Sequence, residues 1–290
     1  MQLYVAANTG RRFKEIKSTM GMVKANDLQE IQNVRRWYDR ISDHFIRRYE
    51  GIEGEYWKAI EENRILRLVP PFTGIALDAG CGNGRFAFAL ATTAHTVIGL
   101  DISNRLLSNA AAKKKEKHTP HTHFVNGDSV ALPFADHRFD LVVSAGMMEY
   151  MQDPTPFLRE IKRVVTPKGT LVFTFHYHTK GIGEVARKII KALPAGLSTN
   201  KNPYARTTDT KRNWTKVWHR PGSITAIVAE AGFSLVKMET CANLLTAFLF
   251  KKCNLRNLAA RLDELESAMP FFPKITAVGV AVCKPLSPSV

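Results

Sequence analysis

Cysteine is scarce in this 290-residue chain, which has four cysteines and no CxxC pair. A disulfide framework or a zinc site needs its ligands at closer and more regular spacing. The sequence therefore excludes a disulfide-stabilised domain and favours a reducing compartment. The stretch HTPHTH contains three closely spaced histidines, His118, His121 and His123, as a metal site could. It precedes a predicted strand, however, and so lies away from the carboxyl ends of the strands, where ligands bind. We expect no metal.

Long apolar runs are also absent. The longest, CANLLTAFLF at 241–250, has about half the length that a membrane-spanning helix needs. The N-terminal stretch MQLYVAANTGRRFKEIK places its apolar residues before its charges and has no cleavage site, which makes it a poor secretory signal. We therefore expect a cytoplasmic protein, with peripheral contact to a membrane as an open alternative. An organellar transit segment stays open, because this stretch is rich in Arg and Lys.

Acidic residues are few relative to basic ones, and the formal net charge is +15. Such a charge by itself suggests nucleic acid, an anionic membrane surface or an acidic substrate. Residues 177–220 hold ten Lys and Arg against two acidic residues, so most of the excess lies in one segment. The charge therefore characterises that segment more than the whole chain.

Apolar strand-like segments alternate with helical ones, and no internal repeat is present. This alternation predicts a Rossmann-like α/β fold with a seven-stranded, mostly parallel sheet and helices on both faces. We expect an N-terminal helical cap at 1–66 and one domain at 67–290, with helical inserts at 177–220 and 241–275. The predicted strands lie at 75–79, 96–103, 122–129, 139–146, 169–176, 233–240 and 276–284.

A glycine-rich turn follows the first predicted strand in LDAGCGNGR, residues 77–85. Its glycines are spaced GxGxG, whereas dinucleotide folds use GxGxxG and triphosphate sites use GxxxxGK[ST]. Asp78 stands two residues before Gly80, where a carboxylate would repel a pyrophosphate. The turn therefore suits a ligand that presents an ammonium or sulfonium cation.

Two further aspartates follow the next two strands. Asp101 comes 21 positions after Gly80, where a carboxylate accepts hydrogen bonds from ribose hydroxyls. Asp128 follows the third strand and is placed to accept from an adenine amino group. Three carboxylates at three consecutive strand ends predict a cationic adenosine ligand, which is S-adenosylmethionine.

These residues make the sequence resemble the class I S-adenosylmethionine-dependent methyltransferases, in particular the subgroup of ubiquinone and menaquinone biosynthesis. The matching stretches are LDAGCGNG, VIGLDIS, NGDSVALPFADHRFDLVVSAGMMEYMQDP and LREIKRVVTPKGTLVFT, and the resemblance covers about residues 70–176. It implies a Rossmann-like fold, S-adenosylmethionine as the methyl donor and a small-molecule acceptor. The residues that it implies around the donor are Tyr38, Asp78, Gly80, Cys81, Gly82, Asp101, Ile102, Asp128, Ser129 and Ala145.

Candidate bases are two histidines in FTFHYHT, His176 and His178, at the end of the fifth strand. They alternate with Tyr177, so their side chains point to the same side if the strand continues. Many relatives have Glu-His where this chain has Glu149-Tyr150, and the missing His removes position 150 as an acid–base candidate. Hydrogen bonding to a substrate, or a plain surface position, is the alternative for both histidines. Cys81 is not expected to act as a nucleophile.

The acceptor is predicted from the segments after the fifth strand. The segment 180–196 has an apolar stripe and a basic face, which fits either an anionic lipid surface or packing on the domain, and 241–275 adds apolar residues. We expect a hydrophobic acceptor such as a phenol, quinol, polyketide or lipid-linked headgroup, with O-methylation first and N- or C-methylation next. The alternative of an RNA or DNA methyltransferase is disfavoured, because the [DNS]PP[YFW] motif of such enzymes is missing after the fourth strand, where this chain reads SAGMMEY. A non-catalytic S-adenosylmethionine-binding protein is the third alternative.

Overall fold

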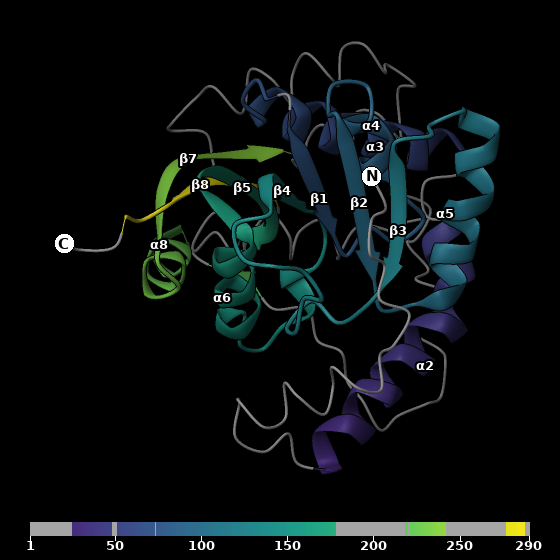
Figure 1. The fold of residues 1–290 in the computed structure, drawn as a ribbon, viewed down its shortest axis with the longest axis horizontal. Coiled ribbons are helices and arrows are strands. Elements are labelled where there is room, and N and C mark those ends of the chain that lie inside the picture. The colour runs from purple at the N-terminus through teal and green to yellow at the C-terminus, as the bar shows by residue number, and fades with distance from the viewer. Residues whose placement is uncertain are drawn as a thin grey trace, which may run out of the picture.

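A mixed sheet forms the centre of the molecule (Figure 1). The computed structural model describes residues 25–47, 51–72, 74–177, 218–219, 221–241 and 277–287. The strand order is β3-β2-β1-β4-β5-β8-β7, and β8 alone runs antiparallel to its neighbours. This confirms the predicted seven-stranded, mostly parallel sheet. The strands are β1 Ile75–Ala79, β2 Thr96–Asp101, β3 Thr122–Asn126, β4 Phe139–Ser144, β5 Val165–Tyr177, β7 Phe233–Cys241 and β8 Ala277–Pro285.

Helices cover both faces of the sheet, as predicted, because β1, β2, β4 and β5 are apolar on both sides. One apolar core contains Ile65, Phe86 and Leu90 and lies between the sheet and the pair α3 and α4. The other contains Phe157, Ile161 and residues of α8, and joins α6 and α8 to the opposite face. The helical elements are α2 Ala25–Arg47, α3 Gly51–Leu68, α4 Arg85–Leu90, α5 Asn104–Lys117, the 3₁₀ turn η1 Met148–Tyr150, α6 Thr155–Val164 and α8 Pro221–Glu230.

Two details of the sheet differ from the sequence-based expectation. A two-residue strand, β6 Trp218–His219, pairs in parallel with the end of β5 and was not predicted, because two residues carry no periodic pattern. β5 begins at Val165, before the predicted start of the strand at residue 169. Phe139 pairs with Val165 but Leu141 pairs with Thr170, so the residues between Val165 and Thr170 bulge out of the ladder inside β5.

The contact between α2 and α5 places α2 beside the carboxyl ends of the strands (Figure 1). Ser103 caps the N-terminus of α5 by accepting a hydrogen bond from Leu106 N, 3.2 Å away. Asp39 of α2 accepts from Ser103 Oγ at 2.6 Å and from Arg105 N at 3.1 Å. A carboxylate at a helix N-terminus is favourable because it satisfies backbone N–H groups there. These contacts of Asp39 with Ser103 and Arg105 form a joint between α2 and α5. The joint holds Tyr38, the residue before Asp39, near the sheet.

Several sequence-based expectations fall on segments outside the described residues. These include His178, the inserts at 241–275 and most of 177–220, and the amphipathic stretch 180–196. The boundary between a cap at 1–66 and a domain at 67–290 stays a prediction.

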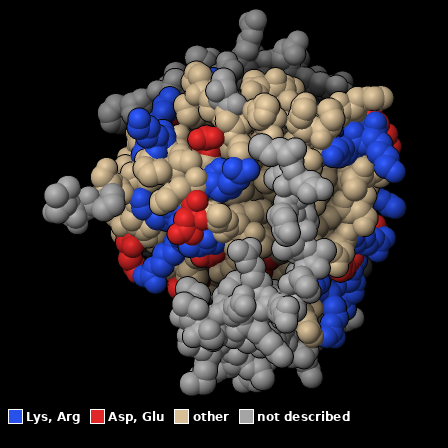
Figure 2. Space-filling model, in the orientation of Figure 1, with Lys and Arg blue, Asp and Glu red and all other residues tan. Residues whose placement is uncertain are grey.

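Within the described part, basic side chains gather along one edge, over α5 with its Lys113–Lys115 run (Figure 2). No helix among the described residues has the length and apolarity to span a membrane.

Candidate functional site

A cavity of about 350 Å³ opens where β1, β2, β3 and β4 end. Loops that follow parallel strands meet at this edge of a sheet, which is where ligands bind in such folds. His176 lines the cavity, whereas His178 lies outside the described residues. All ten residues predicted to surround the donor line it as well, namely Tyr38, Asp78, Gly80, Cys81, Gly82, Asp101, Ile102, Asp128, Ser129 and Ala145.

The glycine turn lies directly on the end of β2. Backbone N–H groups of Gly80 and Cys81 both donate to the carbonyl of Leu100, at 2.8 and 2.9 Å. Gly80 and Gly82 have φ of +78° and +53°, in the left-handed region that glycine tolerates best. A Cβ at Gly80 would lie 2.0 Å from Met147 Sδ, whereas a Cβ at Gly82 would meet no atom within 4 Å. The missing side chain of Gly80 thus lets Met147 pack against the turn, and that of Gly82 leaves room in the cavity for a ligand to approach the backbone.

Asp78 lies beneath this turn and is 1% exposed. Its Oδ2 accepts a hydrogen bond from Ala87 N at 2.8 Å, which ties β1 to the first turn of α4. Burial raises the pKa of Asp78 to about 7, although the hydrogen bond from Ala87 and the charge of Arg85 oppose that rise. A cation in the cavity would favour the ionised carboxylate. Asp78 therefore suits a ligand with a positive charge.

Asp101 is held by backbone donors on both sides. Oδ2 accepts from Gly82 N at 2.8 Å and Oδ1 accepts from Ser103 N at 2.9 Å. Burial raises the pKa of Asp101, and these two backbone bonds lower it. Each carboxylate oxygen has a second acceptor site, so the side chain can still receive hydrogen bonds from a pair of hydroxyls. The structure fixes its orientation at the cavity wall.

Asp128 and Ser129 lie at the end of the cavity formed by the loop after β3. Asp128 Oδ1 accepts from Val130 N at 3.1 Å, which fixes the loop. Burial raises the pKa of Asp128, against lowering contributions from Val130 and Arg35. Ile102 is half-buried at the same wall. Together these residues offer an acceptor and an apolar side chain to a flat polar ring.

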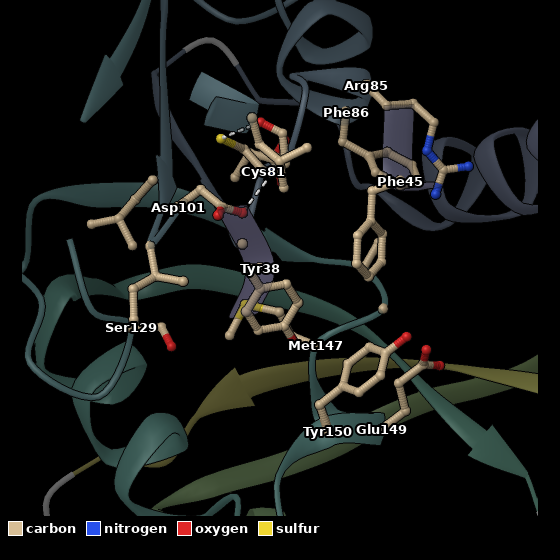
Figure 3. Close-up of a pocket in the computed structure, with 18 of the residues that line it drawn as sticks. Tyr38, Phe45, Cys81, Arg85, Phe86, Asp101, Ser129, Met147, Glu149 and Tyr150 are labelled. Carbon is tan, nitrogen blue, oxygen red and sulfur yellow. Dashed lines mark hydrogen bonds between the residues drawn. The ribbon is translucent and has the colours of Figure 1, made fainter. Parts of the chain in front are cut away.

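Aromatic side chains form the opposite end of the cavity. Figure 3 shows Tyr38 between Asp101 on one side and Tyr150 and Glu149 on the other. The ring of Tyr38 lies 5.7 Å from that of Phe45 and 6.2 Å, edge to face, from that of Tyr150. Burial raises the pKa of Tyr38, and the charges of Asp101 and Glu149 raise it further, so the phenol stays neutral. This end fits a planar apolar molecule.

Sequence reasoning missed a contact at the same end. Glu149 in η1 and His176 in β5 form an ion-pair contact between Oε2 and Nε2. The two side chains are 6% and 14% exposed. Glu149 lies in the segment that follows β4, and β4 pairs with β5, so the segment after β4 and the end of β5 bring the two groups together. A prediction that β4 and β5 are neighbours in the sheet would have indicated this contact.

A second pair also lines the cavity and was not predicted. Arg85, at the start of α4, donates to Glu61 Oε2 of α3 at 2.5 Å, with both side chains largely buried. The guanidinium of Arg85 also lies 4.3 Å from the centre of the Phe86 ring. The pair joins the helical segment before the sheet to the glycine turn.

The remaining sequence candidates lie apart from this chemistry. His118 ends α5, and His121 stacks on His95 with 6.2 Å between ring centres, at the ends of the strands remote from the cavity. The described residues contain no group of three or more His, Cys, Asp or Glu arranged to hold a metal. Burial raises the pKa of the Cys81 thiol well above its usual value, so the thiolate is scarce.

Comparisons with known proteins agree with this geometry. Residues 77–173 match the model of a methyltransferase domain. The chain is 31% identical to a demethylmenaquinone methyltransferase of Anoxybacillus flavithermus over 49% of its length and 61% of the relative's. It is 32% identical to the corresponding protein of Lactococcus lactis over 52% of its length and 60% of the relative's. The chain thus spans about 60% of the length of these relatives.

Solved structures share the fold at low sequence identity. A magnesium protoporphyrin IX methyltransferase from Synechocystis PCC 6803, with bound SAH, has a TM-score of 0.58 at 16% identity, over 88% of this chain and 99% of that one. The [4+2]-cyclase SpnF has a TM-score of 0.59 at 16% identity, over 89% of this chain and 97% of that one. At such identity the likeness concerns the fold alone. Together with the sequence matches and the cavity at the strand ends, it supports a methyltransferase domain at residues 77–173 on a Rossmann-like fold.

Proposed function

We propose that this protein transfers a methyl group from S-adenosylmethionine to a small apolar acceptor, and that the acceptor atom is a hydroxyl oxygen of a phenol, a quinol, a polyketide or a lipid-linked compound. One observation carries the proposal. A single cavity joins the three carboxylates around the glycine turn to an aromatic end that contains His176. Donor and acceptor would therefore share one cavity.

The residues present fit S-adenosylmethionine. Gly82 leaves open space above its backbone, and the buried Asp78 would complement a positively charged amino acid moiety. Asp101 would accept from the ribose, and Asp128 with Ser129 would read the adenine, with Ile102 packed on the ring. When bound, the sulfonium supplies a methyl group that is already activated, so positioning provides much of the rate.

The chain's own residues would prepare the acceptor. Tyr38, Phe45 and Tyr150 would hold a planar molecule and exclude water from it. His176 lies at the wall of the same end, where an imidazole can take a proton from a hydroxyl. His178 stays proposed as a second base, on the sequence pattern alone.

The named relatives favour a quinol-like acceptor over nucleic acid. Both are called demethylmenaquinone methyltransferases, which supports a small aromatic substrate for the shared domain. Methylation at carbon or nitrogen is the first alternative. Because SpnF shares the fold and is a cyclase, the fold alone does not establish methyl transfer, and the test has to measure that transfer directly.

The test uses the purified chain, S-adenosylmethionine with a labelled methyl group, and an organic-solvent extract of the producing cells, with total RNA in a parallel tube. We expect label in the extract, equimolar S-adenosylhomocysteine, and a methoxy group in the product by mass spectrometry. Asp101→Ala should abolish the label, while Glu230→Gln, on the exposed side of α8, should leave it unchanged. Label in RNA, or donor binding without any transfer, would contradict the proposal.

A further inference from the structure

The contact between Glu149 and His176 joins two groups that would each be costly to bury alone. Both line the cavity and both are largely shielded from water. Glu149 comes from the turn after β4 and His176 from the end of the neighbouring strand β5. A buried ion pair adds little net stability, because desolvation offsets the attraction between its charges. The position of this pair at the acceptor end of the cavity therefore indicates a role in function rather than in the stability of the fold.

We infer that Glu149 is the positioning residue that orients His176 and sets its tautomer, and that the pair marks the acceptor as a hydroxyl compound that loses its proton on methylation. The inference rests on the proposed methyl transfer and deepens it. It concerns a residue that the sequence pattern assigned to no role.

The chemistry follows from which nitrogen meets the carboxylate. A neutral imidazole carries one N–H, and the contact of Nε2 with Glu149 Oε2 places that hydrogen on Nε2. Nδ1 is then the basic nitrogen. After it takes a proton the ring is a cation, which the carboxylate of Glu149 stabilises.

The step balances without any further reactant. The acceptor oxygen forms a bond to the methyl carbon, and the carbon–sulfur bond breaks with its electron pair left on sulfur. The hydroxyl proton passes to His176 Nδ1, and solvent takes it after the product leaves. Methylation at a ring carbon of the same hydroxyl compound would deliver the hydroxyl proton to the same nitrogen, so the pair indicates a hydroxyl compound and the product shows which atom carries the methyl group.

Other titratable groups face the pair from neighbouring elements. His219 of β6 lies close enough that burial and the charge of His176 lower its pKa. Tyr38 of α2 feels the charges of Glu149 and Asp101, which with burial keep it protonated. The lowered pKa of His219 and the raised pKa of Tyr38 both favour the uncharged forms of these groups, and Glu149 is the acidic group in contact with His176.

The first experiment needs no acceptor. Nitrogen-15 NMR of the histidines in the full chain, with His176→Asn to assign the signals, reports the tautomer of His176. In the wild type we expect the neutral ring to be protonated at Nε2. Glu149→Gln keeps an oxygen acceptor, so it should keep this tautomer. Glu149→Ala removes the acceptor and should lose the tautomer preference.

The second experiment measures methyl transfer to 4-propylphenol and to a naphthoquinol across pH 5–9. In the wild type, kcat/KM should rise with pH to a plateau. Glu149→Gln should lower kcat by about tenfold or more, with donor affinity unchanged. An Nδ1–H tautomer in the wild type, or an unchanged kcat in Glu149→Gln, would overturn the role of Glu149. Normal NMR behaviour with no methyl transfer to any hydroxyl compound would instead overturn the proposed function.

Discussion

Gly82 is the residue at which backbone conformation and ligand space coincide. Its φ is +53°, and a Cβ there would project into the cavity. We expect Gly82→Ala to weaken donor binding by tenfold or more and to cost about 1 kcal/mol of stability through the left-handed conformation. Calorimetric titration and thermal melting measure the two effects.

Gly232 provides the matched control for that substitution. Its φ is +83°, and a Cβ there would meet the flexible end of Lys162 at 3.3 Å, away from the cavity. Gly232→Ala should therefore show a similar loss of stability with normal donor affinity. Wild-type affinity in Gly82→Ala would show that the donor does not approach this backbone.

Asp78 should make donor binding depend on pH. Its pKa of about 7 means that the carboxylate is protonated below neutral pH. A cationic ligand prefers the ionised form, so affinity should rise with pH and fall by up to about tenfold for each pH unit below 7. Titrations between pH 5.5 and 8.5 measure this, and Asp78→Asn should bind weakly at every pH. A flat profile in the wild type would contradict the assignment.

The same residue has the opposite effect on the free protein. Because burial raises the pKa of Asp78 from 3.8 to about 7, the folded state holds a proton that the unfolded state releases. Its contribution to stability is complete below pH 4 and is lost as the pH rises toward 7. Bound donor should remove this trend, since it stabilises the charge.

At the scale of elements, the joint between α2 and α5 controls where Tyr38 lies. Asp39 accepts from Ser103 and from Arg105 N at the start of α5. Asp39→Ala should cost about 1–2 kcal/mol in urea unfolding, because it removes a helix cap and a contact between two helices. It should also weaken donor binding, since α2 carries Tyr38.

Asp43 is the control on the same helix. It pairs with Arg105 Nη2 at 2.8 Å, but the two side chains are 50% and 53% exposed. Exposed pairs contribute little, so Asp43→Ala should change stability by less than about 0.5 kcal/mol. Equal losses in the two variants would show that the joint depends on charge alone.

For the whole molecule, the donor should stabilise the fold. Ligand at 100 times its dissociation constant adds about 2.7 kcal/mol, which corresponds to a rise in Tm of about 5 °C or more for a chain of this size. S-adenosylhomocysteine should act similarly. NADH and ATP should have no effect, because the turn lacks their phosphate-binding patterns. Differential scanning fluorimetry measures these shifts, and stabilisation by NADH would contradict the choice of ligand.

The sequence by itself determined the order and type of the main strands and the places of Asp78, Asp101 and Asp128. These are local properties, because apolar periodicity defines each strand and a parallel sheet brings strand ends to one edge. The cavity contains all three aspartates, as that reasoning predicts. The family resemblance added Tyr38, which pattern alone would not have selected.

Only the tertiary structure decided which distant residues meet. Glu149 reaches His176 because β4 pairs with β5, and Tyr38 faces Tyr150 because Asp39 holds α2 on α5. The two-residue β6 and the bulge in β5 likewise depend on pairing rather than on periodicity. Such contacts arise from the packing of elements far apart in the chain, for which a single sequence carries no local signal.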